Sequence, residues 1–156
     1  MGKTVFNFED TVRSEWVDYN GHMNDAEYAK VFSRSVDAFM DFIGLTAESR
    51  ASYSYTMFTL ETHICYLKEA HEKEKLIVEM QLLDSDAKRL HVFFTMKNAN
   101  GDLAATSEQM LMGMDSELGK PAPFPKQVDA VIEELKMAHK ELATPKQAGR
   151  KIGIKR

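Results

Sequence analysis

The sequence predicts a single α+β domain in which a mostly antiparallel sheet wraps around one long central helix. Three observations lead to this fold class. Apolar residues recur at helical spacing over residues 25–43, four runs of alternating apolar and polar residues come later, and these runs follow one another as successive hairpins. A helix with a wide apolar face must be covered, and such a sheet can cover it. A chain of 156 residues is long enough for one domain with its own core.

The first predicted elements are a strand and the long helix. The strand covers residues 4–17, where two phenylalanines alternate with polar neighbours, and a turn over residues 18–23 follows it. Asn24 is a favourable helix N-cap, and Glu27 stands three residues later, as in a capping box. Gly44 lies where a C-terminal cap glycine is expected. The apolar positions of the helix are Ala29, Phe32, Val36, Phe39, Met40 and Ile43.

The sheet and a C-terminal helix make up the rest of the domain. After a loop rich in Ser and Tyr, the predicted strands are residues 56–67, 76–83, 90–96 and 103–114. In the first of them, alternation places Phe58, Leu60, Thr62, Ile64 and Tyr66 on one face and Thr59, Glu61, His63 and Cys65 on the other.

A hairpin turn and a C-terminal helix are predicted from turn residues and prolines. Residues 98–102, Asn-Ala-Asn-Gly-Asp, predict a hairpin turn between the last two strands. A second amphipathic helix follows Pro125, with apolar positions from Val128 to Leu142, and Pro145 ends it. The domain is therefore predicted over residues 1–144, followed by a mobile basic tail over residues 145–156.

Composition and charge exclude several classes of function. The formal net charge of −4 argues against nucleic acid as the main partner, because phosphate binding needs clustered Lys and Arg. The single cysteine, Cys65, cannot form an internal disulfide and fits a reducing cytoplasm, where we expect the protein. We expect no membrane association, since no apolar run reaches the roughly 20 residues of a membrane span and the N-terminus lacks a signal-peptide run.

Residues 18–25 place a carboxylate close to a helix N-terminus. Asp18 is either a turn aspartate beside Asn20-Gly21 or a catalytic carboxylate that acts as nucleophile or as general base on water. The N–H groups of the following helix, nominally those of Asp25 and Ala26, lie at the positive end of the helix dipole. Aimed at a developing oxyanion, they would promote cleavage of an activated acyl bond.

Two polar neighbours, His22 and Asn24, complete this arrangement. His22 either packs in the turn or positions water or the substrate carbonyl. Asn24 most simply caps the helix, so that its contribution to catalysis would be indirect. His22, His63 and His91 have no Cys or His partner at zinc-like spacing along the chain, and we therefore expect no metal ligands.

Several other side chains are candidates for substrate binding. Glu61 and His63 share one predicted strand face, which is either an exposed polar face or part of a pocket. Trp16, Tyr28 and Tyr55 belong to the core or an interface, or they line a pocket that holds a quaternary ammonium group by cation–π attraction beside Glu61.

A phosphate-bearing group has one candidate contact. Lys88 and Arg89 lie in the turn over residues 84–91, which is either a charged hairpin loop or a contact for phosphates. The chain contains no P-loop and no Rossmann glycine pattern, so a nucleotide portion would lie on the surface.

The motif Asp18-Tyr-Asn-Gly-His-Met-Asn24, with Tyr28 and the helix behind it, resembles the hotdog-fold thioesterases of the 4-hydroxybenzoyl-CoA thioesterase group. The resemblance covers roughly residues 5–142. It implies a hotdog fold, assembly as a homodimer or homotetramer, and an acyl-CoA substrate at the subunit interface. It also implies that Asp18 is catalytic and that the N–H at Asp25 polarises the thioester carbonyl. Asp25 stands where the family often has a second Asn.

A narrower resemblance is to the betainyl-CoA thioesterases of bacterial carnitine catabolism. It rests on residues 15–28, 55–63, 83–91 and 105–110. It implies hydrolysis of betainyl-CoA to betaine and free CoA, with CoA as part of the substrate and no separate cofactor. Two alternatives remain open: a thioesterase for another short or aromatic acyl-CoA or an acyl carrier protein, and a non-catalytic protein that binds acyl-CoA.

Overall fold

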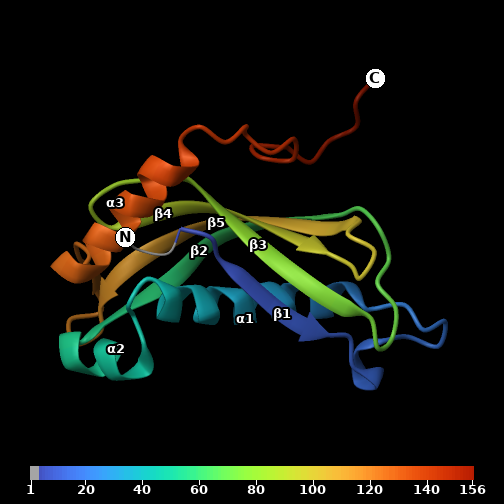
Figure 1. Ribbon diagram of the computed structural model, residues 1–156, viewed down its shortest axis with the longest axis horizontal. Coiled ribbons are helices and arrows are strands. Elements are labelled where there is room, and N and C mark those ends of the chain that lie inside the picture. Colours follow the sequence, from blue (N-terminus) through green and yellow to red (C-terminus); the bar gives the residue numbers. More distant parts are fainter. Residues whose placement is uncertain (1–3) are drawn as a thin grey trace.

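The computed structural model describes residues 4–156 and shows a curled antiparallel sheet around one long helix (Figure 1). The strands follow the order β1-β3-β4-β5-β2, and the short β6 pairs with β5. The strands are β1 (Asn7–Thr11), β2 (Tyr55–Tyr66), β3 (Lys75–Ser85), β4 (Arg89–Lys97), β5 (Leu103–Asp115) and β6 (Lys120–Pro121). The helices are α1 (Asp25–Phe42), α2 (Ala47–Tyr53), α3 (Lys126–His139) and a short 3₁₀ helix, Ser14–Trp16. The predicted α+β class and the sheet wrapped around a central helix are confirmed. The prediction that the four later strands are successive hairpins is correct for β3–β4 and β4–β5 but wrong for β2, which pairs with β5 instead of β3.

The core lies between α1 and the sheet. Phe94 of β4 contacts both Phe32 and Phe39 of α1, at ring-centroid distances of 6.4 and 6.5 Å. We call this side of the sheet the α1 face and the other side the outer face. Because successive side chains of a strand point to opposite faces, Phe93 belongs to the outer face. Helix α3 lies on the outer side of the sheet (Figure 1), where the ring of His139 accepts the N–H of Leu82 through Nδ1 at 2.9 Å.

Two predicted elements differ from the structure at the start of the chain. The first strand is limited to Asn7–Thr11, because the chain then turns through the 3₁₀ helix to bury Trp16. The loop rich in Ser and Tyr contains α2, whose N-cap Thr46 accepts the N–H of Ser49 at 3.1 Å. A single N-cap signal in a short polar segment is weak, which is why the pattern predicted a loop.

The predicted C-terminal end of α1 agrees with the structure, whereas that of α3 does not. Helix α1 ends at Phe42, and Gly44 has φ +95°, as the C-terminal cap prediction requires. Helix α3 ends at His139, so Leu142 lies outside it and is exposed. The predicted hairpin turn is confirmed, because the Asn98 side-chain oxygen accepts the N–H groups of Asn100 and Asp102, each at 3.0 Å.

A bulge in β2 changes the predicted faces of that strand. The register with β5 shifts between Thr59 and Glu61, so Phe58 pairs with Met112 whereas Thr62 pairs with Gln109. Met112 and Gln109 lie on opposite faces of β5, and therefore so do Phe58 and Thr62. The prediction that Phe58 shares a face with Thr62 is wrong, because a bulge inserts one residue and reverses the alternation.

The two outer strands of the sheet differ in character. Strand β1 is short and carries the charged Glu9, which forms an ion pair with Lys75 at 3.2 Å. Strand β2 is longer, pairs only with β5 within residues 4–156, and exposes about half of the side chains of Phe58 and Leu60. A long apolar edge of this kind is the one that invites pairing with another chain.

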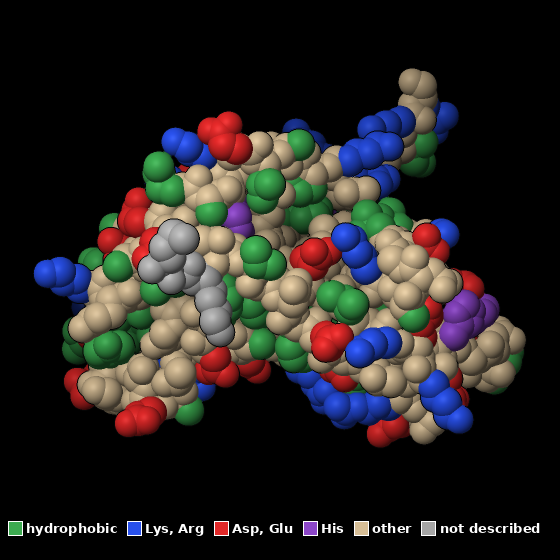
Figure 2. Space-filling model, in the orientation of Figure 1, with side chains coloured by type: hydrophobic (Ala, Val, Ile, Leu, Met, Phe, Trp, Pro, Cys, Tyr) green, Lys and Arg blue, Asp and Glu red, His purple; other side chains and the backbone are tan. Residues whose placement is uncertain are grey.

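The C-terminal tail passes over the outer side of the sheet and then projects from it, and Figure 2 shows its basic side chains gathered there. The Gly149 N–H donates to Oε1 of Glu108 at 2.7 Å. The mobility predicted for residues 145–156 stays a prediction, and the first three residues of the predicted domain lie outside the described range.

No helix within residues 4–156 is long and apolar enough to cross a membrane.

Candidate active site

The turn before α1 is closed by its own aspartate. The Asp18 N–H donates to the His22 carbonyl at 2.9 Å, and Oδ1 of Asp18 accepts the N–H groups of Asn20 at 2.8 Å and His22 at 3.1 Å. Gly21 has φ +77°, which a glycine adopts without strain. The Asp18 side chain thus has the turn role that the sequence allowed. Its second oxygen, Oδ2, has no hydrogen bond to the described residues, and the residue is exposed to solvent.

Helix α1 begins at the predicted residue but without the predicted capping box. Asn24 is the N-cap, yet its side chain makes no capping hydrogen bond, and its N–H donates to the Trp16 carbonyl at 2.9 Å. The Glu27 carboxylate lies 3.1 Å from Nζ of Lys30 instead of reaching back to Asn24. The capping-box prediction is wrong because the chain before the helix already provides the main-chain partner.

The first turn of α1 keeps one amide available. The Ala26 N–H is bonded to Oδ1 of Asp25 at 2.9 Å, and the Glu27 N–H to the Asn24 carbonyl at 3.0 Å. For the Asp25 N–H, the described part of the chain provides no acceptor. This amide lies at the positive end of an 18-residue helix, which suits it to polarise a carbonyl oxygen.

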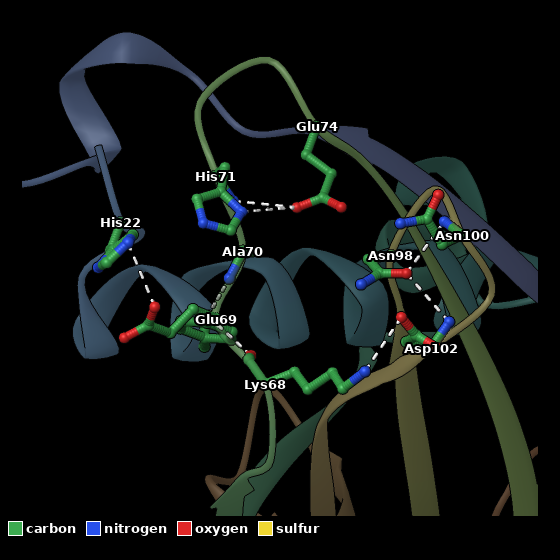
Figure 3. Close-up of polar contacts among 10 residues, drawn as sticks. His22, Lys68, Glu69, Ala70, His71, Glu74, Asn98, Asn100 and Asp102 are labelled. Atoms are coloured by element: carbon green, nitrogen blue, oxygen red, sulfur yellow. Dashed lines mark hydrogen bonds and ion pairs between the residues drawn. The ribbon is translucent and has the colours of Figure 1, made fainter. Parts of the chain in front are cut away.

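The loop between β2 and β3 is anchored against this turn (Figure 3). The Met23 N–H donates to the Ala70 carbonyl at 2.8 Å, and the Ala70 N–H donates to the Tyr28 hydroxyl at 2.9 Å. Nε2 of His22 lies 3.2 Å from Oε2 of Glu69. The loop therefore places a carboxylate beside a histidine that is 47 positions away along the chain.

A cavity of about 280 Å³ opens at the N-terminus of α1. It is lined by Met23, Asp25, Tyr28, Tyr66, Leu67, Lys68 and Glu69. The rings of Tyr28 and Tyr66 stand perpendicular to each other with centroids 5.3 Å apart. Burial raises the pKa of both phenols, so both remain neutral at physiological pH. The cavity thus combines two neutral aromatic rings with two carboxylates and a helix N-terminus.

The predicted catalytic residues lie in the turn before α1 and at the start of this helix, and one of them lines the cavity. Asp25 lines it, and His22 adjoins it through Glu69. Asp18 is bonded to His22 in the turn, although it does not itself line the cavity within one chain. Asn24 is the N-cap residue between the turn and the helix, and its N–H donates to the Trp16 carbonyl.

Trp16 is placed differently from the other predicted binding residues. Its side chain is buried, and the Arg13 and Arg34 guanidinium carbons lie 4.8 and 5.3 Å from its ring centroid. Lys30 adds a third cation at 5.9 Å. Because the protein's own cations already surround this ring, the structure does not place Trp16 in a cavity where a cationic ligand would bind.

Glu61 and His63 lie on the outer face of the sheet. Tyr66 of the same strand contacts Tyr28 of α1, so residues at odd distances from it point to the other side. They line a second cavity of about 470 Å³, together with His91 and Glu108. This cavity is larger, but it contains no helix N-terminus and lies on the opposite face from Asp25. Within one chain, the structure does not bring Glu61 and His63 to the predicted catalytic turn.

Tyr55, Lys88 and Arg89 lie at the far end of the sheet. Tyr55 begins β2, whereas Tyr66 ends it, and eleven steps of a strand span roughly 35 Å. The buried Tyr55 hydroxyl donates to the Ala122 carbonyl at 2.7 Å. Nη2 of Arg89 lies 2.6 Å from Oδ2 of Asp86, and this hydrogen-bonded guanidinium lowers the pKa of Asp86 to about 2. These three residues are separated from the α1 N-terminus within one chain.

Sequence reasoning missed Glu69 and His71. Both lie in residues 68–75, a segment rich in charged residues that connects β2 to β3. A glutamate and a histidine separated by one residue form no recognised motif. Only the folded loop shows that they face the turn before α1.

The comparisons with known proteins agree with this architecture. Residues 12–132 match the thioesterase-like superfamily. A betainyl-CoA thioesterase of Pseudomonas aeruginosa is 41% identical over 155 residues, which is 99% of this chain and 98% of that protein. The L-carnitine dehydrogenase/betainyl-CoA thioesterase of Rhizobium meliloti is 42% identical over 93% of this chain, which corresponds to 29% of that longer protein.

A solved structure supports the same assignment. A Staphylococcus aureus protein in complex with CoA superposes with a TM-score of 0.92 and 37% identity, covering 99% of this chain and 98% of that chain. Together with the sheet wrapped around α1, these similarities show that the chain belongs to the thioesterase-like superfamily of hotdog-fold proteins.

Proposed function

We propose that this protein hydrolyses the CoA thioester of a small cationic acyl group, betainyl-CoA, to betaine and free CoA. The observation that carries the proposal is the cavity at the N-terminus of α1, where an available helix amide lies beside two aromatic rings and two carboxylates. The full-length similarity to a betainyl-CoA thioesterase supports the same substrate. Turnover of carnitine in a reducing cytoplasm is the setting we propose for this reaction.

The reaction follows from the turn and the helix. The Asp25 N–H donates a hydrogen bond to the thioester oxygen as negative charge develops on it, a contribution of about 10²–10³ in rate for a single donor. The free oxygen of Asp18 acts on the carbonyl carbon, either directly as nucleophile or through a water molecule that it deprotonates. His22 adjoins both Asp18 and Glu69 and positions the substrate carbonyl or the water.

The cation selectivity is assigned to the cavity at the α1 N-terminus. Glu69 and Asp25 provide negative charge, and Tyr66, which is half exposed, offers a ring face to a quaternary ammonium group. The cation in the lining, Lys68, lies 3.2 Å from Asp102 and is thus already neutralised. In this proposal, Glu69 and Asp25 provide the negative charge beside the cation that the sequence pattern predicted for Glu61, which lies on the outer face of the sheet.

A two-fold dimer would complete the site. Pairing of β2 with β2 of a second copy about a two-fold axis is antiparallel, so the Tyr55 end of one strand meets the Tyr66 end of the other. Lys88 and Arg89 of the second copy would then approach the α1 N-terminus of the first. Phosphates of CoA bound by these residues would leave the thioester at the helix start. A tetramer formed from two such dimers is compatible with this arrangement.

The test is a comparison of substrates with the purified protein. We expect betainyl-CoA to be hydrolysed with a kcat/KM at least tenfold above that of its neutral isostere, 3,3-dimethylbutanoyl-CoA. Only the cationic acyl group is attracted by the charge of Glu69 and the ring of Tyr66. Equal rates on the two substrates would remove the cation site and favour another short or aromatic acyl-CoA. Binding of acyl-CoA without any turnover would show a non-catalytic binding protein.

A further inference from the structure

We propose that His22, Glu69 and His71 form a binding site for a divalent transition metal ion, of which Zn²⁺ is the best fit. One ligand atom from each of the three side chains lies within 4.8 Å of those of the other two. Two imidazoles and one carboxylate form a ligand set that Zn²⁺ commonly binds in proteins. The proposal changes the expectation of no metal site, which considered only ligand spacing along the chain.

The backbone holds the three residues in place. His22 and His71 face each other directly in an isolated antiparallel bridge, and their rings are 5.1 Å apart between centroids. The Met23 N–H bonds to the Ala70 carbonyl, and the Glu72 N–H bonds to the Gly21 carbonyl at 3.3 Å. The ligands therefore come from two segments that pair before any ion arrives, and only side-chain rotations are needed to close the site.

A second carboxylate supports His71 from behind. Oε1 of Glu74 accepts the main-chain N–H of His71 at 3.0 Å and lies 3.7 Å from Nδ1 of the His71 ring. In Figure 3, the Glu74 side of the His71 ring is opposite the side on which His22 and Glu69 lie. A ligating histidine usually gives its other ring nitrogen to a carboxylate, which orients the ring and strengthens it as a ligand. A small rotation of the His71 ring would bring Nδ1 within hydrogen-bond distance of Glu74.

The surroundings favour a cation and allow it to enter. Two of the three lysines of the loop are occupied elsewhere, since Lys68 pairs with Asp102 and Lys75 pairs with Glu9. The ligand side chains are all accessible to solvent, with exposed fractions of 34% for His22, 67% for Glu69 and 58% for His71. Figure 2 shows histidine side chains beside acidic ones on the surface at this end of the molecule.

The expected geometry is an open tetrahedral site. Zn²⁺ binds imidazole nitrogen at about 2.0–2.1 Å and carboxylate oxygen at about 2.0–2.2 Å, so the side chains must move closer by rotation. Three protein ligands leave the fourth position to water. Mg²⁺ and Ca²⁺ prefer oxygen ligands and are poor candidates for a site with two imidazoles.

Metal binding at this position would inhibit the enzyme. The ion would take Nε2 of His22 and the carboxylate of Glu69, which adjoin the cavity at the α1 N-terminus. It would also replace the negative charge that attracts a cationic acyl group with a positive one. This consequence, unlike the binding itself, rests on the proposed function.

The first experiment measures binding directly, without reference to activity. The full-length protein is freed of metal with a chelator and titrated with Zn²⁺ in competition with a chromophoric indicator. We expect one Zn²⁺ per chain, and we expect His71→Gln and Glu69→Gln each to weaken binding by about tenfold or more. His91→Gln removes a histidine that also lies beside a glutamate, Glu108, but on the outer face; it is the control and should leave the affinity unchanged.

Several results would overturn the site. They are an absence of Zn²⁺ binding by the parent protein, unchanged affinity in both His71→Gln and Glu69→Gln, or an equal loss in His91→Gln. Circular dichroism of each variant, compared with the parent, shows whether an affinity change reflects unfolding. Mg²⁺ at the same concentrations should not displace Zn²⁺.

The second experiment tests inhibition. We expect Zn²⁺ to reduce hydrolysis of betainyl-CoA at the concentrations at which it binds, and we expect a chelator to restore the rate. The His71→Gln protein should retain the parent rate without Zn²⁺ and resist inhibition. Binding of Zn²⁺ without inhibition would overturn the regulatory half of the proposal. If no acyl-CoA is hydrolysed at all, the proposed function fails while the binding result stands.

Discussion

Asp18 and His22 are joined at both ends of one tight turn: the Asp18 N–H donates to the His22 carbonyl at 2.9 Å, and the His22 N–H donates to Oδ1 of Asp18 at 3.1 Å. The same carboxylate therefore shapes the turn through Oδ1 and leaves Oδ2 available for the proposed reaction. A structural role and a catalytic role for Asp18 are not alternatives in this fold.

Asp18→Asn should separate these two roles. The asparagine retains Oδ1 as an acceptor for the turn, so we expect the melting temperature to stay close to that of the parent. The amide is neither a base nor a nucleophile, so kcat should fall by about 10²–10⁴. Asp18→Ala, measured alongside, should lose activity and also about 1–3 kcal/mol of stability through two lost hydrogen bonds. An Asp18→Asn protein as active as the parent would refute the mechanism.

The exposed edge of β2 should control assembly. We expect Leu60→Lys to shift the protein from dimer to monomer in light scattering, because a lysine on an edge strand opposes pairing with another strand. The rate of hydrolysis should fall as well, because in the proposed dimer the second copy provides the contacts to the CoA phosphates. Val5→Lys, an exposed apolar residue outside the strands, is the control and should leave the assembly unchanged. A variant that remains dimeric would place the interface elsewhere.

Lys88 and Arg89 should affect the binding of CoA and not the chemical step. Alanine at either position should raise KM for the acyl-CoA by about tenfold, as expected for a lost charged contact, with kcat nearly unchanged. Asp86→Asn should act in the opposite direction, because it frees the Arg89 guanidinium from its ion pair while keeping the oxygen that holds the turn. If KM is the same in all three variants, the phosphates bind elsewhere.

Gly113 should tolerate no side chain. A Cβ at this position would lie 1.7 Å from the Tyr55 hydroxyl oxygen, which is held by its bond to the Ala122 carbonyl. We expect Gly113→Ala to lose about 1–3 kcal/mol of unfolding free energy in urea titrations, the usual cost of overpacking. Gly153→Ala, where nothing lies within 4 Å of the added carbon, should have no effect.

Stability should decline above about pH 10 because of buried tyrosines. Burial raises the pKa of Tyr55, so the folded protein holds this proton more tightly than the unfolded chain, whose tyrosine pKa is about 10. The stabilisation is therefore complete below that pH and is lost as the pH rises toward the raised pKa, with a slope of up to about 1.4 kcal/mol per pH unit. Urea unfolding between pH 8 and 11 measures it.

Tyr55→Phe provides the control for the alkaline effect. It should lower stability by about 1 kcal/mol at pH 8 through the lost hydrogen bond to Ala122, yet reduce the slope above pH 10. An identical slope in this variant would assign the alkaline loss to other groups, including Tyr28 and Tyr66, whose pKa values burial also raises.

Local patterns were sufficient for most of the fold. The apolar repeat that begins beyond Asn24 specified α1, since a helix must bury its apolar side, and the Asn-Gly turn at residues 98–102 specified the hairpin between β4 and β5. The bulge at Leu60 was not predictable, because an inserted residue interrupts pairing without altering the apolar character of the strand. As a result, the faces of β2 before the bulge were assigned incorrectly.

By itself, the sequence determined the long helix, the positions of the four later strands along the chain and the turn that joins Asp18 to the start of α1. These features depend on residues near one another along the chain. The sequence did not determine the order of the strands in the sheet, because β2 pairs with β5 and not with β3. Only the tertiary structure decided that Glu61 and His63 lie away from this turn and that Glu69 and His71 lie against it. The physical reason is that strand register and loop closure place residues by main-chain hydrogen bonds between distant segments, and these bonds leave no local pattern in the side chains.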